Sequence, residues 1–207
     1  MQYNTIVLER QFASGGREIA QTLSQRLNIP CYGQEILREA ANQMGVTVAE
    51  LAKLEESTTG SFLFSLYAFA KASAGESISL TKAQQLLLAE SRIIQEKAAN
   101  GPCIFLGRCA ARALGDSARV LKVFIQTDYE KRLRRATDEY GHTQKEAERL
   151  IRHHDKKRAD YYKATAGVDW RDPDQYHVIL DSGVLGMDRT INILCGCVQT
   201  RQWHVVR

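Results

Sequence analysis

One stretch near the N-terminus constrains this chain more than any other, namely residues 6–19, which read IVLERQFASGGREI. A short apolar run rich in β-branched residues leads into a polar loop with paired glycines, and apolar residues then recur at helical spacing. This pattern predicts a strand, a glycine-rich turn and a helix. Such a turn presents successive backbone N–H groups at the positive end of a helix, where a phosphate binds favourably.

The residues of this loop suit an anion but match the phosphate-loop pattern G-x-x-x-x-G-K-[ST] poorly. Gly15 and Gly16 permit positive φ and close backbone approach, and Arg17 adds a fixed positive charge. If residues 16–18 stand for the G-K-[ST] end of the pattern, Gln11 replaces the opening glycine and Arg17 replaces the lysine. The residues alone therefore leave two interpretations open: a phosphate site, or a tight turn that needs glycine and binds nothing.

Composition excludes several classes of protein. The chain has 207 residues, 44% of them hydrophobic and 25% charged, which is typical of one globular domain. No apolar run approaches the roughly 20 residues that a membrane helix needs, and residues 1–4 lack the start of a signal peptide. The five cysteines are scattered and odd in number, which predicts free thiols and a cytoplasmic location rather than disulfides or a metal site.

Positive charge is concentrated in one part of the chain. Residues 131–163 contain 11 lysines and arginines against 6 acidic residues, whereas the rest of the chain is close to neutral. This stretch favours an anionic partner, either a nucleotide, a polyphosphate or a nucleic acid, unless it is simply a solvated helix surface. Acidic residues are interleaved there and no aromatic stacking platform is evident, so we expect nucleotides rather than nucleic acid.

Apolar segments of strand type alternate with helical patterns along the chain, which predicts a parallel sheet with helices on both faces. Three capping boxes predict helix starts after Thr47, Thr127 and Thr143. Residues 57–61 are expected to form a loop. The aromatic segment 62–69 is expected to be a helix or a mobile flap, with its rings packed in the core. On the long helix expected over 81–100, Glu90 shares the apolar face, and we place it at the wet edge of that face rather than at a ligand.

Ligands of such sheets bind at the carboxyl ends of the strands. Polar residues follow each expected strand and therefore form one candidate site, at residues 10–17, 33–35, 107–108, 127–128 and 181–182. Arg108 directly follows a buried strand, so it either faces the site or makes a structural salt bridge.

Four segments, taken in order, carry a resemblance that covers nearly the whole chain. They are residues 5–32, residues 101–110 (GPCIFLGRCA), residues 123–125 with the basic run 130–135, and residues 155–162 (DKKRADYY) with 169–173. Together they resemble the cytidylate kinase-like family of P-loop nucleoside monophosphate kinases, in which the segment that corresponds to residues 101–110 has the form G-P-x-V-I-x-G-R-x-A.

The resemblance implies a three-layer P-loop NTPase fold, with a five-stranded parallel sheet flanked by helices. It implies a single domain over residues 1–207, with a helical acceptor-binding region at 34–100 and a lid at 141–165. It also implies transfer of the γ-phosphoryl group of ATP to CMP or a similar acceptor, with Mg²⁺. Whether the chain forms homo-oligomers stays open.

The resemblance also suggests roles for individual residues. Arg17 would replace the family's lysine, and Arg158 with Arg152 would close from the lid onto the transferring group, which makes these three the candidate catalytic residues. Arg38 and Arg108 would hold the acceptor phosphate. The candidate phosphate-binding residues are Arg10, Gln11, Ser14, Gly15, Gly16, Arg17 and Glu18.

The chain departs from the family pattern at several of these positions. No lysine occurs between Met1 and Lys53, and Glu18 replaces the hydroxyl that would hold Mg²⁺, so the metal ligands are not identified. An alignment without gaps from the following helix places Gly16 at the lysine position and Arg10 at the opening glycine. These departures support two alternatives: a non-catalytic nucleotide sensor on a kinase fold, and a kinase for another small phosphate acceptor.

Overall fold

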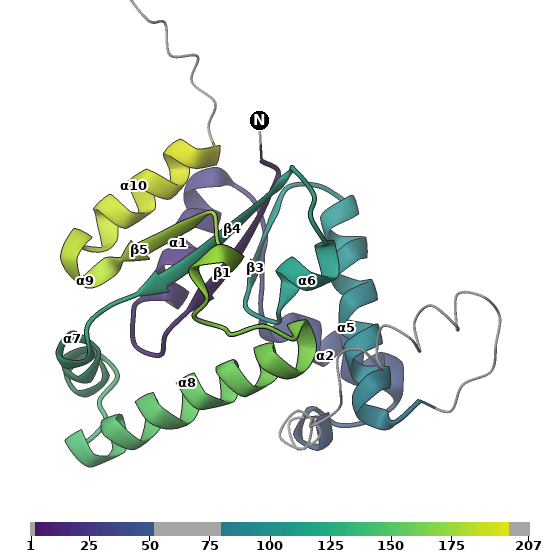
Figure 1. The fold of residues 1–207 in the computed structure, drawn as a ribbon, viewed down its shortest axis with the longest axis horizontal. Helices are drawn as coiled ribbons and strands as arrows, with labels where there is room; N and C mark the ends of the chain where they lie inside the picture. Colours follow the sequence, from purple (N-terminus) through teal and green to yellow (C-terminus); the bar gives the residue numbers. More distant parts are fainter. Residues whose placement is uncertain (1–2, 52–79, 199–207) are drawn as a thin grey trace, which may run out of the picture.

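The predicted parallel sheet is present in the computed structural model, which describes residues 3–51 and 80–198. Within those residues, five strands form one parallel sheet in the order β2-β3-β1-β4-β5 (Figure 1). The strands are β1 (Thr5–Arg10), β2 (Cys31–Tyr32), β3 (Cys103–Leu106), β4 (Val120–Gln126) and β5 (Val178–Asp181). The expected α/β class and strand number are therefore confirmed.

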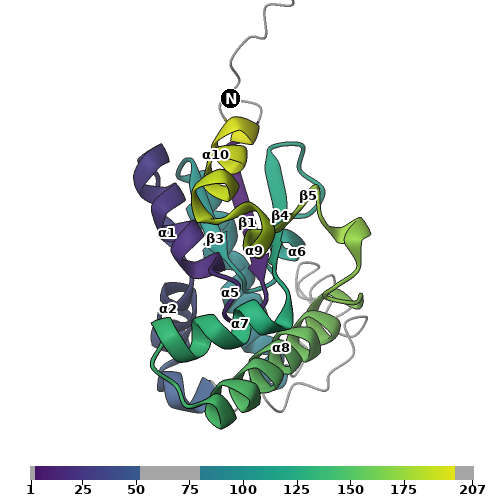
Figure 2. The same ribbon diagram turned by 90° about the vertical axis from the view of Figure 1, so that its left-hand side faces the viewer.

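Helices lie on both faces of this sheet and along its carboxyl edge (Figures 1 and 2). They are α1 (Gly16–Leu27), α2 (Gln34–Met44), α5 (Lys82–Ala99), α6 (Ala110–Leu114), α7 (Tyr129–Arg134), α8 (Gln144–Ala166), α9 (Ser182–Leu185) and α10 (Met187–Val198). A π-helical turn, Arg135–Glu139, follows α7, and a 3₁₀ turn, Pro173–Gln175, precedes β5. None of the described helices is both long enough and apolar enough to cross a membrane.

Strand β1 lies at the centre because its apolar side chains alternate between two cores. Ile6 and Leu8 pack with residues of α1 and α10, whereas Val7 packs with residues of α2 and α5. Each such fully buried aliphatic side chain contributes about 1.5–3 kcal/mol of transfer free energy. The glycine-rich turn that follows β1 is thereby held at the middle of the carboxyl edge of the sheet.

Two of the three predicted capping boxes are confirmed. Thr47 and Glu50 exchange the expected hydrogen bonds, and Thr143 caps α8. The expectation for Thr127 is wrong by one residue, since the N-cap of α7 is Asp128, whose side chain accepts from the N–H of Lys131. The expectations for residues 57–61 and 62–69 lie outside the described residues.

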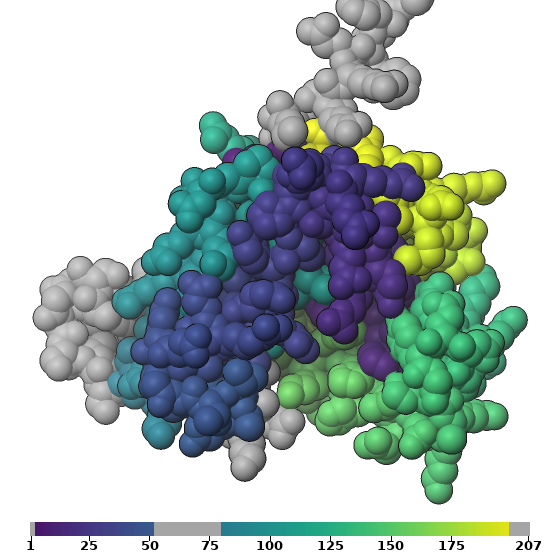
Figure 3. All heavy atoms as spheres, turned by 180° about the vertical axis from the view of Figure 1, so that it is seen from behind, coloured from purple at the N-terminus to yellow at the C-terminus, as the bar shows by residue number. Residues whose placement is uncertain are grey.

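Helix α8 runs across the carboxyl edge of the sheet (Figures 1 and 2). Its residues form hydrogen bonds both to the β1–α1 loop (residues 11–15) and to Glu90 of α5. Helix α5 packs on the face of the sheet opposite to α1. From behind, the surface is hollowed between α2 and α7, and α8 is visible at the back of this hollow (Figure 3). In an open α/β sheet this edge is where a ligand binds.

Candidate functional site

The β1–α1 loop ends in an uncapped helix start. Gly15 is the N-cap residue of α1, with φ 77°, and no side-chain hydrogen bond caps the helix. The first amide bonded within the helix is that of Ile19, which donates to the carbonyl of Gly15 at 2.9 Å. The N–H groups before it have no acceptor within the helix, and N–H groups of this kind, together with the helix dipole, favour a nearby anion.

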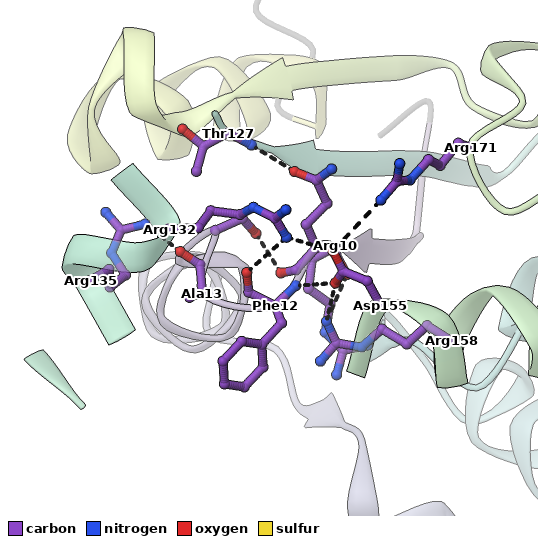
Figure 4. A network of polar contacts seen from close by, with 11 residues as sticks. Arg10, Phe12, Ala13, Thr127, Arg132, Arg135, Asp155, Arg158 and Arg171 are labelled. Carbon is purple, nitrogen blue, oxygen red and sulfur yellow. Dashed lines mark hydrogen bonds and ion pairs between the residues drawn. The ribbon is translucent and has the colours of Figure 1, made fainter. Parts of the chain in front are cut away.

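Three arginines, from α7, the π-helical turn and α8, hold carbonyl oxygens of this loop and of Arg10 at the end of β1 (Figure 4). Arg158 donates to the carbonyl of Arg10 at 3.0 Å, Arg132 to that of Phe12 at 3.3 Å, and Arg135 to that of Ala13 at 3.2 Å. Ala13 has a positive φ of 57°, which is uncommon outside glycine. These bonds fix the loop backbone without using the amides at the start of α1.

Asp155 of α8 lies at the centre of the same network (Figure 4). Its carboxylate accepts the N–H of Phe12 at 2.7 Å and the guanidinium of Arg132 at 2.5 Å. Arg158 and Arg171 lie farther from it, at 3.9 and 3.7 Å. The side chains of Arg132 and Asp155 are only 7% and 9% exposed, so this pair joins α8 to the loop away from water.

Residues that follow β4 and β5 secure the opposite side of the loop. The N–H of Thr127 donates to Oε1 of Gln11 at 3.0 Å, and its hydroxyl donates to Asp181 at 3.1 Å. Ser182 donates to the carbonyl of Ser14 at 2.5 Å, and Ser14 in turn donates to the carbonyl of Gln11 at 2.9 Å. Of the polar residues predicted to meet at the carboxyl edge of the sheet, Thr127, Asp181 and Ser182 bond to the loop or to one another, and the side chains of Gln11 and Ser14 shape the loop.

Arginines also crowd the ends of β1 and β3. Burial is the main cause that lowers the pKa of Arg10, and the positive charges of Arg158, Arg108 and Arg17 lower it further. The carboxylate of Glu9 acts in the opposite direction. Several cations that disfavour one another in a partly buried place form a site that an anion would stabilise.

Arg108 is presented by an unusual turn after β3. Gly107, Arg108 and Cys109 all have positive φ, at 76°, 64° and 50°. For two residues other than glycine this conformation costs free energy, and such strain tends to occur at functional sites. Arg108 pairs with Glu90 at 3.2 Å, and Tyr161 donates to Glu90 at 2.6 Å. The expected wet position of Glu90 is wrong, because these partners let it be buried to 2% exposure.

Other predicted site residues lie nearer to solvent. Arg17 and Arg152 are exposed, and so is Arg38, which forms a surface pair with Glu35 at 3.6 Å. Helix α8 contacts the loop through Asp155 and through His154, which stacks on Phe12, and it contacts the end of β1 through Arg158, whereas Arg152 points to solvent. The catalytic roles of Arg17 and Arg152 and the acceptor-binding role of Arg38 stay predictions.

Glu18 and Gly16 both lie at the start of α1, and Gly16 is buried. Glu18 accepts the hydroxyl of Tyr140 at 3.0 Å through Oε1, while its buried Oε2 has no hydrogen-bond partner among the described residues. Within residues 3–51 and 80–198, no group of three or more side chains that could hold a metal ion is assembled.

Sequence reasoning assigned no role to four residues of the site: Glu9, Arg132, Arg135 and Asp155. The basic stretch 131–163 indicated an anionic partner, but it did not indicate that its arginines face loop carbonyls. Glu9 is buried, which raises its pKa, and Trp170 donates to it at 3.4 Å. The position of Glu9 was the only indication in the sequence that it belongs to the site, because a charged residue there interrupts an apolar strand.

Comparison with known proteins agrees with this architecture. The model of the cytidylate kinase-like family matches residues 5–184. The cytidylate kinase of Methanopyrus kandleri is 25% identical over 190 residues, which is 87% of this chain and 86% of that protein. A crystal structure of an uncharacterized protein from Eubacterium ventriosum has a TM-score of 0.70 at 22% identity, covering 95% of this chain and 99% of that one. The chain therefore belongs to the cytidylate kinase-like family.

Proposed function

We propose that this protein transfers the γ-phosphoryl group of ATP to a small phosphate acceptor, with CMP as the first candidate. The observation that carries the proposal is the gathering of arginine charge beside an uncapped helix start. Arg108 and Arg158 lie close enough to Arg10 to lower its pKa, and the N–H groups at the start of α1 lie beside Arg10. A group with several phosphate charges would complement this arrangement.

Phosphoryl transfer needs little covalent chemistry from a protein, since positioning and charge neutralisation supply most of the effect. The start of α1 would hold the phosphates of the donor. Arg108, presented by the strained turn after β3, would hold the acceptor. Arg158 would contact the transferring group from α8, which also covers the edge and would exclude water as a competing acceptor.

The residues present are compatible with Mg²⁺ at the start of α1. Magnesium in phosphoryl-transfer sites is held by one or two carboxylates together with substrate phosphates. The buried Oε2 of Glu18 offers one such oxygen, and its other oxygen is already oriented by Tyr140. When bound, the ion would neutralise charge on the donor phosphates.

Two observations favour a second candidate, a nucleotide sensor that does not catalyse transfer. The N–H of Phe12 is taken by Asp155 rather than left for a phosphate. In addition, no lysine occurs between Met1 and Lys53, so the loop lacks its usual cation. Such a protein would bind ATP without forming product.

A coupled assay for ADP release, with ATP and Mg²⁺ against a panel of nucleoside monophosphates, separates the two candidates. The kinase should turn over with CMP, and Arg108→Ala should lower turnover by roughly a hundredfold, the scale for loss of a charge-stabilising donor. Arg119→Ala is the matched control, because Arg119 is exposed and lies before β4, at the opposite end of the sheet. ATP binding without turnover on any acceptor would support the sensor and reject the kinase.

A further inference from the structure

We propose that Arg10, at the end of β1, supplies the positive charge that a phosphate loop ordinarily takes from its lysine, and that Gly16 lacks a side chain to make room for it. This inference rests on the proposed function and identifies the residue that holds the transferred phosphate. It also assigns the lysine's role to a different residue from Arg17, to which the resemblance alone would give it.

The helix start fixes which residue occupies the lysine position. In the pattern G-x-x-x-x-G-K-[ST], the lysine directly follows the closing glycine of the loop. Gly15 is the N-cap of α1 with a φ of 77°, and the helix begins at Gly16. Gly15 is therefore the closing glycine, and Gly16 stands at the lysine position. Counting back, Arg10 takes the place of the opening glycine.

The backbone does not require glycine at position 16. The positive φ of Gly15 explains a glycine there, whereas Gly16 lies outside the positive-φ residues and is helical. Another constraint must favour it, and the nearest atoms supply one: a Cβ at Gly16 would lie 2.5 Å from Cβ and 2.8 Å from Cγ of Arg10.

The path of the Arg10 side chain connects the two halves of the site. Its stem passes Gly16 at the donor loop, and its guanidinium reaches Gly107 at the end of β3, where an added Cβ would meet Nη1. The next residue after Gly107 is Arg108, the candidate for holding the acceptor. The guanidinium thus lies between the loop that would hold the donor and the strand end that would hold the acceptor.

Burial and charge distinguish Arg10 from Arg17. Arg10 is half-buried, whereas Arg17 is exposed on the first turn of α1. A charge held away from water interacts more strongly with a bound anion. The carbonyl of Arg10 is itself fixed by Arg158 at 3.0 Å, so the residue is positioned before any ligand arrives. A guanidinium can also hold two phosphate oxygens at once, which suits a group reaching across from a strand.

Moving the charge back to the helix tests this inference. We would measure the affinity for Mg²⁺–ATP and for inorganic triphosphate by calorimetry in four variants: Arg10→Gly, Gly16→Ala, Arg17→Ala and the double variant Arg10→Gly with Gly16→Lys. Arg10→Gly should weaken ATP binding roughly 10- to 100-fold, the range for a hydrogen bond to a charged group. The double variant should bind within a few-fold of wild type, because it restores a cation at the lysine position.

Gly16→Ala removes no charge, yet it should also weaken ATP binding, because its methyl group displaces Arg10. Arg17→Ala should bind within about threefold of wild type, as expected for a screened surface charge. Thermal unfolding of each variant shows whether it is folded. If Arg10→Gly does not fold, the comparison of the folded Gly16→Ala and Arg17→Ala variants still decides the question.

Two outcomes would overturn the inference while leaving the proposed function intact. One is wild-type ATP affinity in Arg10→Gly, and the other is a loss in Arg17→Ala that exceeds the loss in Gly16→Ala. If the wild-type protein binds neither ATP nor triphosphate, the proposed function itself fails, and the inference fails with it.

Discussion

Replacing Asp155 with alanine should destabilise the protein strongly, because this carboxylate joins α8 to the β1–α1 loop. The substitution removes the acceptor of the Phe12 N–H and the ionic partner of Arg132. Arg132 would keep the carbonyl of Phe12 at 3.3 Å, but its guanidinium would stay buried without a negative charge. An uncompensated buried charge is the main cost of breaking a pair of this kind.

The geometry sets the size of the effect. Removing one member of a buried ion pair costs about 3–5 kcal/mol. We expect the lower end of this range, about 3 kcal/mol. The other two arginines, Arg158 and Arg171, lie 3.9 and 3.7 Å from Asp155, and the loss of such partly exposed pairs adds little to the cost. In a domain of this size 1 kcal/mol shifts the melting temperature by about 2–4 °C, so Asp155→Ala should lower it by roughly 6–12 °C.

Helix α8 offers a matched control for this measurement. Asp160 pairs with Lys156 on the same helix at 2.5 Å, but the two side chains are 64% and 76% exposed. Exposed pairs on a helix contribute about 0.3–0.5 kcal/mol, so Asp160→Ala should shift the melting temperature by no more than about 2 °C. Both variants remove one carboxylate from α8, and therefore only burial and the contact with the loop differ.

Thermal unfolding followed by circular dichroism would measure both shifts. A double variant, Asp155→Ala with Arg132→Met, should recover part of the loss, since it removes the unpaired buried charge. Equal shifts in Asp155→Ala and Asp160→Ala would refute the reasoning. So would a double variant whose loss of stability equals the sum of the losses measured for Asp155→Ala and Arg132→Met singly.

Three further predictions concern single residues of the site. Gly15→Ala should lower the free energy of unfolding by roughly 1–3 kcal/mol in a denaturant titration, because its φ of 77° strains any side chain. Burial and then the charge of Arg158 lower the pKa of His154 to about 4, so the unfolded state binds more protons and stability falls as the pH drops from 6.5 towards 4. His154→Phe, which preserves stacking on Phe12 at 4.6 Å, should show a smaller loss of melting temperature over that range, and an unchanged loss would count against this cause. Burial raises the pKa of Glu9, so the folded state binds its proton more tightly and stability falls as the pH rises above 4.5. Glu9→Gln should therefore melt higher than wild type at pH 7 and equal to it near pH 4, whereas a lower melting temperature at pH 7 would show that its contacts with arginines dominate.

Local patterns predicted the strands and most helix starts, because strands and helix starts depend mainly on residues that are adjacent in the chain. The alternation of Ile6, Val7 and Leu8 between two cores follows from the period of a strand, and it placed the glycine-rich turn correctly. Two capping boxes were confirmed for the same reason. The third failed because Thr127 and Asp128 can each cap a helix, and Thr127 is bonded to Asp181 and Gln11 instead.

The arrangement around the loop could not be predicted, because it joins residues far apart in the chain. Asp155 and Phe12 are separated by 143 positions, and Arg132 and Phe12 by 120. Arg135 begins the π-helical turn after α7, and no residue pattern announces such a turn. Glu90 on an apolar helix face was expected to be wet, since its partners Arg108 and Tyr161 belong to other elements.

The use of arginine throughout this site has a physical consequence for how it would bind an anion. Arg158 donates one N–H to the loop carbonyl of Arg10, and Arg135 donates one to that of Ala13. A guanidinium carries five N–H donors in a rigid plane, so each of these side chains keeps donors for a phosphate while it holds the loop. The loop and its cations are thus ordered together before a ligand arrives, which lowers the reorganisation needed when an anion binds. A lysine has a flexible stem and a single charged nitrogen, so it could not hold the backbone and also present two donors in a fixed plane. We expect this to be why arginines can bind the anion where the loop has no lysine.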